Sequence, residues 1–237
     1  MKPKTNTVHT SRTMMFREIS SLIDHQVFDE NSIVEMNILG KLSASGIRST
    51  LNYLSRLYDF KEANQLWKVF LSLWEMAEES DKRIMTLLYA LYKDELLRVS
   101  IPIVLNTKPG KRVEPWAVKE AIGKAYPGRY ASSTSISAAQ NTLSSWKQAG
   151  YIEGKFRNNR VTVKPGKPSV LFALFLGYTE GKVGEDLLKT IWVDTLEFSK
   201  VQLHEMLAQA SLNDLIGYRR AGGITIIQFE PLLNHIQ

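Results

Sequence analysis

The sequence predicts a mainly α-helical fold with one β-hairpin in the middle of the chain and a short strand near its end. Over most of the chain, apolar residues recur three and four positions apart, which is the repeat of an amphipathic helix. Residues 151–163 instead alternate between apolar and polar side chains, and residues 224–229 form a short apolar run, as strands do. With 237 residues, 44% of them hydrophobic, the chain is long enough for one to three globular domains.

Residues 1–103 are expected to form an N-terminal helical bundle. Three- and four-residue steps connect the apolar positions, as in Phe16, Ile19 and Ile23 and again in Leu51, Leu54 and Leu57. We interpret this region as five helices. Trp67 and Trp74 share such faces with Leu and Val, so we expect them in the core rather than in a base-stacking platform.

A second module is expected at residues 104–168, after an interruption rich in Pro, Gly and Lys at residues 106–112. Pro115 suits the first turn of a helix whose apolar stripe contains Val118 and Ile122. The next helix is predicted over residues 134–148, with one face turned inward, made of Ile136, Ala139, Leu143 and Trp146.

The hairpin follows this helix directly, with its turn predicted at residues 157–160, where Asn158 and Asn159 tolerate a positive φ. A helix, a turn, a second helix and a β-hairpin in this order are typical of a winged helix, a helix-turn-helix fold with a hairpin wing. Residues 169–237 are expected to form a C-terminal helical tail, with a turn at residues 219–223 before the terminal strand at 224–229.

Positive charge is concentrated in the central module. Residues 104–168 contain 12 Lys and Arg against 3 Asp and Glu, a local charge of +9 in a chain whose total is +6, which leaves the flanks together at −3. Such a concentration favours a polyanionic partner. Together with the winged-helix order, it predicts binding of double-stranded DNA.

The residues expected to contact DNA fall into two groups. Short polar side chains on the outer face of the second helix can approach base edges in the major groove, namely Thr134, Ser137, Asn141 and Ser145. Cations on and near the hairpin are expected to bind phosphates, namely Lys155, Arg157, Arg160, Lys164, Lys167 and Arg129. Taken alone, each feature is also typical of an ordinary solvated surface, and the prediction depends on their combination.

Other functional classes have little support in the sequence. The four histidines, His9, His25, His204 and His235, show no paired metal spacing, and there is no phosphate-binding loop of the Walker type. We therefore expect no enzyme activity, no metal and no cofactor. A nuclease or other hydrolase would need clustered carboxylates, and no spacing in the sequence indicates them. No Cys is present, which fits a reducing cytoplasm. The longest apolar run, residues 170–178, is too short to cross a membrane.

The arrangement of the whole chain resembles the small BrxA-like accessory proteins of BREX bacterial phage-defence systems. The features that carry the resemblance are Thr10-Ser11 before a helix, the run Leu87-Leu-Tyr-Ala-Leu-Tyr92, and a Ser-rich helix that closes with Ala149-Gly-Tyr-Ile152. It spans most of residues 10–229. It implies a non-enzymatic DNA-binding component encoded beside a methyltransferase and large ATPase-type proteins.

An alternative function stays open at this point. Winged helices also serve as protein-docking modules, so the chain could instead be an assembly hub that recruits the methyltransferase or ATPase partner. Binding to duplex DNA at low salt distinguishes the two hypotheses.

Overall fold

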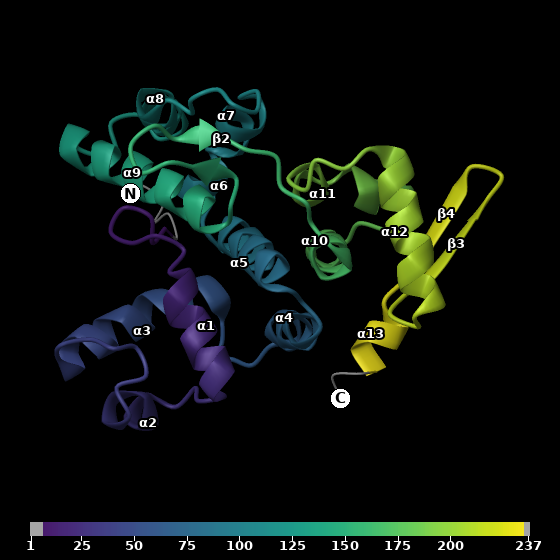
Figure 1. Ribbon diagram of the computed structural model, residues 1–237, viewed down its shortest axis with the longest axis horizontal. Helices are drawn as coiled ribbons and strands as arrows, with labels where there is room; N and C mark the ends of the chain where they lie inside the picture. The colour runs from purple at the N-terminus through teal and green to yellow at the C-terminus, as the bar shows by residue number, and fades with distance from the viewer. Residues whose placement is uncertain (1–6, 235–237) are drawn as a thin grey trace. The chain divides into compact units, whose positions relative to one another are not determined.

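The computed structural model describes residues 7–234, in which the chain divides into two compact units. Unit 1 combines the described residues of 1–63 with 89–162, and unit 2 combines 64–88 with the described residues of 163–237. Thirteen α-helices and two small antiparallel sheets form within residues 7–234 (Figure 1). The predicted mainly helical fold is therefore confirmed.

The division differs from the three consecutive domains predicted at 1–103, 104–168 and 169–237. Residues 64–88 leave the N-terminal region and join unit 2, as do residues 163–168. The reason is packing between distant segments: the aromatic face of α4 (Gln65–Glu75) lies against α10 (Lys167–Thr179), with the Phe70 and Phe172 ring centroids 5.3 Å apart. Such long-range packing is invisible to local periodicity.

Unit 1 begins with three helices, α1 (Phe16–His25), α2 (Glu30–Glu35) and α3 (Ala44–Tyr58), drawn in purple and blue in Figure 1. Side-chain oxygens cap the last two: Asp29 accepts a hydrogen bond from the Ser32 amide, and Ser43 accepts one from the Gly46 amide. Each cap satisfies an amide that the helix itself leaves without a partner.

The rest of unit 1 contains the end of α5 (Glu79–Lys93), α6 (Glu95–Arg98), α7 (Ile101–Leu105), α8 (Pro115–Ala125), α9 (Ser132–Gln148), β1 (Ile152–Glu153) and β2 (Asn159–Arg160). Helices α8 and α9 pack closely and bury Val118, Ile122 and Leu143. Trp146 is fully buried; its indole N–H donates to the Ser100 hydroxyl at 2.7 Å. This core fixes the direction in which α9 leads into the hairpin.

Unit 2 is built around α10, in which every residue from Pro168 to Gly177 is buried. Around it pack α4, the 3₁₀ helix η1 (Gly184–Lys189), α11 (Ile191–Asp194) and α12 (Lys200–Leu212). A side chain at Gly177 would lie 2.9 Å from Thr190, so glycine permits this close approach. No helix among residues 7–234 has both the length and the apolar character needed to cross a membrane.

The chain of unit 2 closes with the hairpin β3 (Gly217–Ala221) and β4 (Ile224–Gln228), followed by α13 (Glu230–Asn234). The predicted terminal strand is confirmed as β4. The turn predicted at residues 219–223 is wrong in its first half, because Arg219 and Arg220 belong to β3 and only Gly222 and Gly223 have the positive φ of the turn. Strand β3 lacks a buried apolar face, which removes the usual sequence signal of a strand.

Candidate nucleic-acid interface

The hairpin of unit 1 carries a third segment on its outer edge. Strands β1 and β2 pair Ile152 with Arg160 and Glu153 with Asn159. The segment between α7 and α8 lies antiparallel to β2, where the Gly110 amide donates to the Arg160 carbonyl at 2.7 Å and the Arg160 amide donates to the Lys111 carbonyl at 2.8 Å. The order in unit 1 is therefore helix, edge segment, two helices and hairpin.

The tip of this hairpin is formed by residues 154–158, not by the turn predicted at 157–160. Gly154 and Asn158 have φ of 82° and 52°, which reverses the chain between the two-residue strands. Lys155 and Arg157 are exposed, and between them Phe156 is 79% exposed, its ring centroid 5.4 Å from the Lys155 ammonium. The tip thus presents two cations around one apolar ring.

Lys147 connects the tip to α9. Its ammonium donates to the Lys155 carbonyl at 3.2 Å, and partial burial lowers the pKa of Lys147. The contact holds the hairpin tip close to the last turn of α9, so the positions of these two elements are coupled.

Arg160 does not lie on the surface, so its predicted role in phosphate binding is wrong. Its side chain is fully buried and donates to the carbonyls of Val104, Tyr151 and Val161, with its guanidinium carbon 5.2 Å from the Tyr151 ring centroid. Val104 belongs to the last turn of α7, where its carbonyl also accepts a hydrogen bond from the Thr107 amide at 3.2 Å. Arg160 therefore ties the hairpin to α7 and to the end of α9.

The C-terminal half of the predicted base-facing surface is covered by the N-terminal segment of the same unit. Ser145 is fully buried and accepts a hydrogen bond from the Met14 amide at 2.8 Å, so its predicted exposure is wrong. Asn141 is half-buried and donates to the His9 carbonyl at 3.0 Å. Gln148 accepts from the Phe16 amide at 3.0 Å. Two of these polar groups, Ser145 and Asn141, were expected to face a DNA groove.

The N-terminal half of α9 remains accessible. Ser137 is exposed and Thr134 is half-exposed, as expected, but Ile136 is 44% exposed although it was predicted to face inward. Small side chains explain the difference: Ser135, Ala138 and Thr142 are buried instead. They let α9 take close neighbours on two sides, α8 on one and the N-terminal segment on the other.

A buried array of His9, Asp94 and Ser145 fixes the N-terminal segment. His9 Nδ1 lies 2.7 Å from Asp94 Oδ2 and His9 Nε2 lies 2.9 Å from Ser145 Oγ, the connectivity of a Ser-His-Asp triad. All three residues are fully buried, and the Ser145 oxygen is already occupied by the Met14 amide. We therefore assign this array a structural role, that of holding the N-terminal segment in place. Sequence inspection missed it because its members lie far apart in the chain.

The remaining predicted phosphate contacts are divided between the two units. Arg129 lies in the connection between α8 and α9, with its guanidinium carbon 5.7 Å from the Tyr130 ring centroid. Lys164 and Lys167 belong to unit 2, where Lys167 is the first residue of α10. Neither is part of the hairpin on which it was placed.

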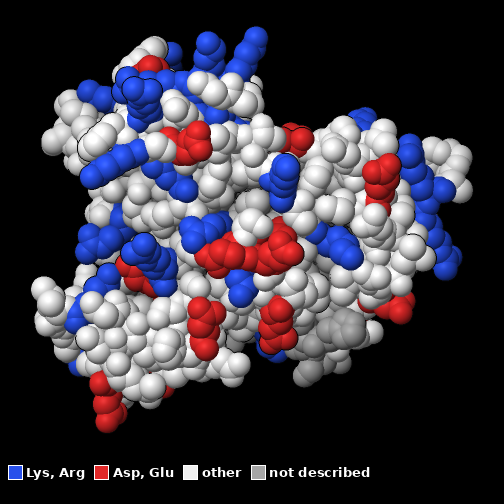
Figure 2. Space-filling view, viewed as in Figure 1, with Lys and Arg blue, Asp and Glu red and all other residues white. Residues whose placement is uncertain are grey.

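Three cations that sequence inspection did not assign lie beside the hairpin. Lys108, Lys111 and Arg112 are exposed on the segment that pairs with β2. Figure 2 shows Lys and Arg side chains gathered over the part of unit 1 where Figure 1 labels α7, α8 and β2. Their signal in the sequence was the interruption at residues 106–112, which was interpreted only as a domain boundary.

Comparison with known proteins adds no relative: no protein family, curated protein or solved structure matches the chain. Within residues 7–234, no three His, Asp or Glu side chains are grouped as a metal ion would require.

The buried position of Arg160 predicts a large effect on stability. Replacing Arg160 by Met should lower the free energy of unfolding by about 2–4 kcal/mol, because three carbonyls lose a charged donor. Urea unfolding followed by tryptophan fluorescence measures it. The control Arg157→Met, at an exposed position, should change stability by less than about 0.5 kcal/mol. Equal effects of the two substitutions would contradict the assignment.

Proposed function

We propose that unit 1 carries a winged-helix module that binds double-stranded DNA. The observation that supports it best is the order α7, edge segment, α8, α9, β1 and β2, with exposed cations at the hairpin tip and along its edge. In such modules the second helix of the pair enters the major groove and the wing contacts the flanking backbone.

Because the C-terminal half of α9 is covered, only residues in its N-terminal half are proposed to contact DNA bases. The exposed Ser137 and the half-exposed Thr134 are the proposed base-facing residues, since small polar side chains allow close approach to base edges. Lys155 and Arg157 at the tip and Lys111 and Arg112 at the edge are the proposed phosphate contacts. The resemblance to the BREX accessory proteins supports the same role, a non-enzymatic component of a phage-defence system.

The salt dependence of binding tests this proposal. These four phosphate contacts would give a slope of about −3.6 in log K against log salt, so affinity should fall about 150-fold between 50 and 200 mM NaCl. Fluorescence anisotropy with a labelled duplex measures it. Failure to bind any duplex at the lower salt concentration would refute the proposal.

The alternative of a protein-docking module is favoured by one observation. Three large apolar side chains of this basic module are exposed: Trp116 (64%), Ile136 (44%) and Phe156 (79%). Aromatic and aliphatic anchors of this kind are typical of protein interfaces. If duplex DNA does not bind, co-purification with a methyltransferase or ATPase encoded nearby, abolished by Trp116→Ala, would support this function.

A further inference from the structure

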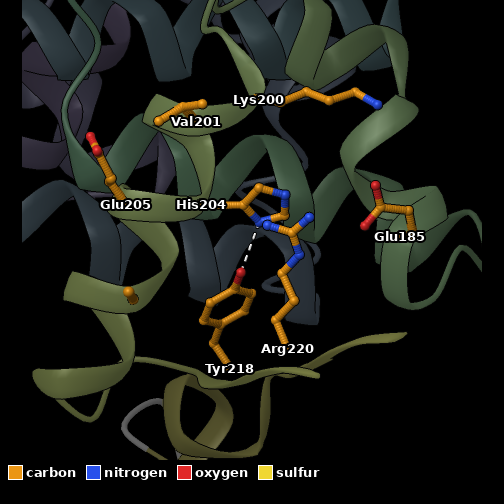
Figure 3. A pocket seen from close by; sticks show the side chains of 8 residues that line it. Glu185, Lys200, Val201, His204, Glu205, Tyr218 and Arg220 are labelled. Carbon is orange, nitrogen blue, oxygen red and sulfur yellow. Dashed lines mark hydrogen bonds between the residues drawn. The ribbon is translucent and has the colours of Figure 1, made fainter. Parts of the chain in front are cut away.

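Unit 2 contains a cavity of about 470 Å³ between α12 and β3, shown in Figure 3. Its charged and aromatic lining consists of Glu185, Lys200, His204, Glu205, Tyr218 and Arg220. Small apolar side chains complete it. The cavity belongs to the other unit from the proposed DNA interface, and it uses none of the residues assigned there.

His204 and Tyr218 form a hydrogen-bonded pair at the back of this cavity. The distance from His204 Nδ1 to the Tyr218 hydroxyl oxygen is 2.7 Å. Burial raises the pKa of Tyr218, so the hydroxyl keeps its proton and can donate it to Nδ1. A neutral imidazole that accepts at Nδ1 carries its own hydrogen on Nε2. His204 is thereby prepared to donate a hydrogen bond into the cavity.

Two cations in the lining have no counter-charge bound to them. Neither the Lys200 ammonium nor the Arg220 guanidinium makes a hydrogen bond or an ion pair with another residue in the described range 7–234. Burial lowers the pKa of His204, and the nearby positive charges of Arg220 and Lys200 lower it further, against the opposing negative charge of Glu185. In Figure 3, the Arg220 side chain extends from β3 to the level of the His204 ring.

The two carboxylates of the lining leave this positive side of the cavity available. Glu185 accepts a hydrogen bond from the Thr225 hydroxyl at 2.8 Å, and that bond is the main reason the pKa of Glu185 is lowered, with smaller contributions from the charges of His204, Lys189 and Lys200. Glu205 points away from Arg220 and Lys200 in Figure 3. A negatively charged group that enters between Arg220, Lys200 and His204 therefore meets donors on two elements.

We propose that this cavity binds a phosphate monoester. A guanidinium can donate two parallel hydrogen bonds to phosphate oxygens, an ammonium adds a compact charge, and the His204 N–H supplies a further directional donor. A tetrahedral phosphate dianion can accept hydrogen bonds from all of these donors at once more readily than a planar carboxylate can. Arg220 and Lys200 supply the charge, and the Tyr218–His204 pair supplies orientation.

The test is an NMR titration of the His204 ring signals with inorganic phosphate, with NaCl at matched ionic strength as the control. The His204→Gln variant assigns the signals. Saturable shifts are expected at millimolar phosphate, together with a rise in the pKa of His204, because a bound anion favours the imidazolium. Acetate should bind more weakly. Shifts that do not saturate, or that NaCl reproduces, would overturn the proposal.

Matched variants distinguish phosphate binding in this cavity from a nonspecific effect of positive charge. Arg220→Ala and Lys200→Ala should each weaken phosphate binding at least about tenfold, since each removes a charge-assisted hydrogen bond. Arg219→Ala is the control: Arg219 is the neighbour on the same strand, it is exposed as Arg220 is, and it does not line the cavity. Equal losses in Arg219→Ala and Arg220→Ala would also overturn the proposal.

Discussion

Replacing Lys155 and Arg157 together by alanine is expected to weaken binding to duplex DNA by about 10-fold to 100-fold and to reduce the salt slope by about 2. Both cations are exposed at the hairpin tip, where Gly154 and Asn158 hold the turn. Because each neutralised phosphate releases counterions, the loss should be greatest at low salt. Anisotropy titrations of the double variant at several NaCl concentrations measure both quantities.

The matched control removes the same amount of charge elsewhere. Lys68→Ala together with Lys182→Ala changes two exposed lysines of unit 2 and lowers the net charge equally. Its affinity and slope should remain close to those of the unmodified protein. If the control loses as much affinity as the tip variant, binding reflects net charge and not the hairpin.

Asp94→Ala is expected to lower the free energy of unfolding by about 3–5 kcal/mol, the usual cost of removing one partner from a buried charged pair. Asp94 accepts hydrogen bonds from the Val8 amide and His9, and it also caps α6 through the Leu96 and Leu97 amides. Thermal unfolding followed by circular dichroism measures the change. Asp24→Ala, at an exposed position of α1, should cost less than about 0.5 kcal/mol. A similar loss in both variants would contradict the role of Asp94.

The same carboxylate should shape the acid stability of the protein. Burial raises the pKa of Asp94, but the hydrogen bond from His9, the charge of that residue and the hydrogen bonds from the Val8 amide and Thr7 outweigh it, so the pKa falls from 3.8 to about 2. A lowered pKa stabilises the fold fully above pH 3.8, and roughly 2 kcal/mol is lost as the pH falls towards 2. Asp94→Ala should therefore flatten the acid limb of the stability profile. An unchanged limb would contradict this prediction.

The hairpin shows how much of the structure the alternation of apolar and polar residues could predict. The alternation of residues 151–163 indicated a hairpin, and the exposure of Lys155 and Arg157 agrees with the prediction. The pair Asn158-Asn159 suggested a turn that begins three residues too late, at residue 157, whereas the chain already reverses from Gly154. With that register, Arg160 pairs with Ile152, and both side chains are buried. Because the turn lies earlier than predicted, Arg160 is a core residue and not the surface cation that was expected.

Helix α9 shows a different limit. Its length, its packing on α8 and the burial of Leu143 and Trp146 follow from helical spacing and were predicted. The burial of Ser145 was not, because the group that covers it, the N-terminal segment with His9, lies 136 positions earlier in the chain. A Ser-rich face has the same local pattern whether water, DNA or another segment of the protein covers it.

The division of the chain into interleaved segments also constrains how the protein folds during synthesis. Each unit draws on two separate stretches, so the chain changes unit at residues 63/64, 88/89 and 162/163. Unit 1 cannot close until residue 162 has left the ribosome, and contacts such as His9 to Ser145 enclose long loops whose closure is entropically costly. We therefore expect residues 104–168 not to fold independently: excised from the chain, they would lose Ser100 beneath Trp146 and the N-terminal segment over Ser145.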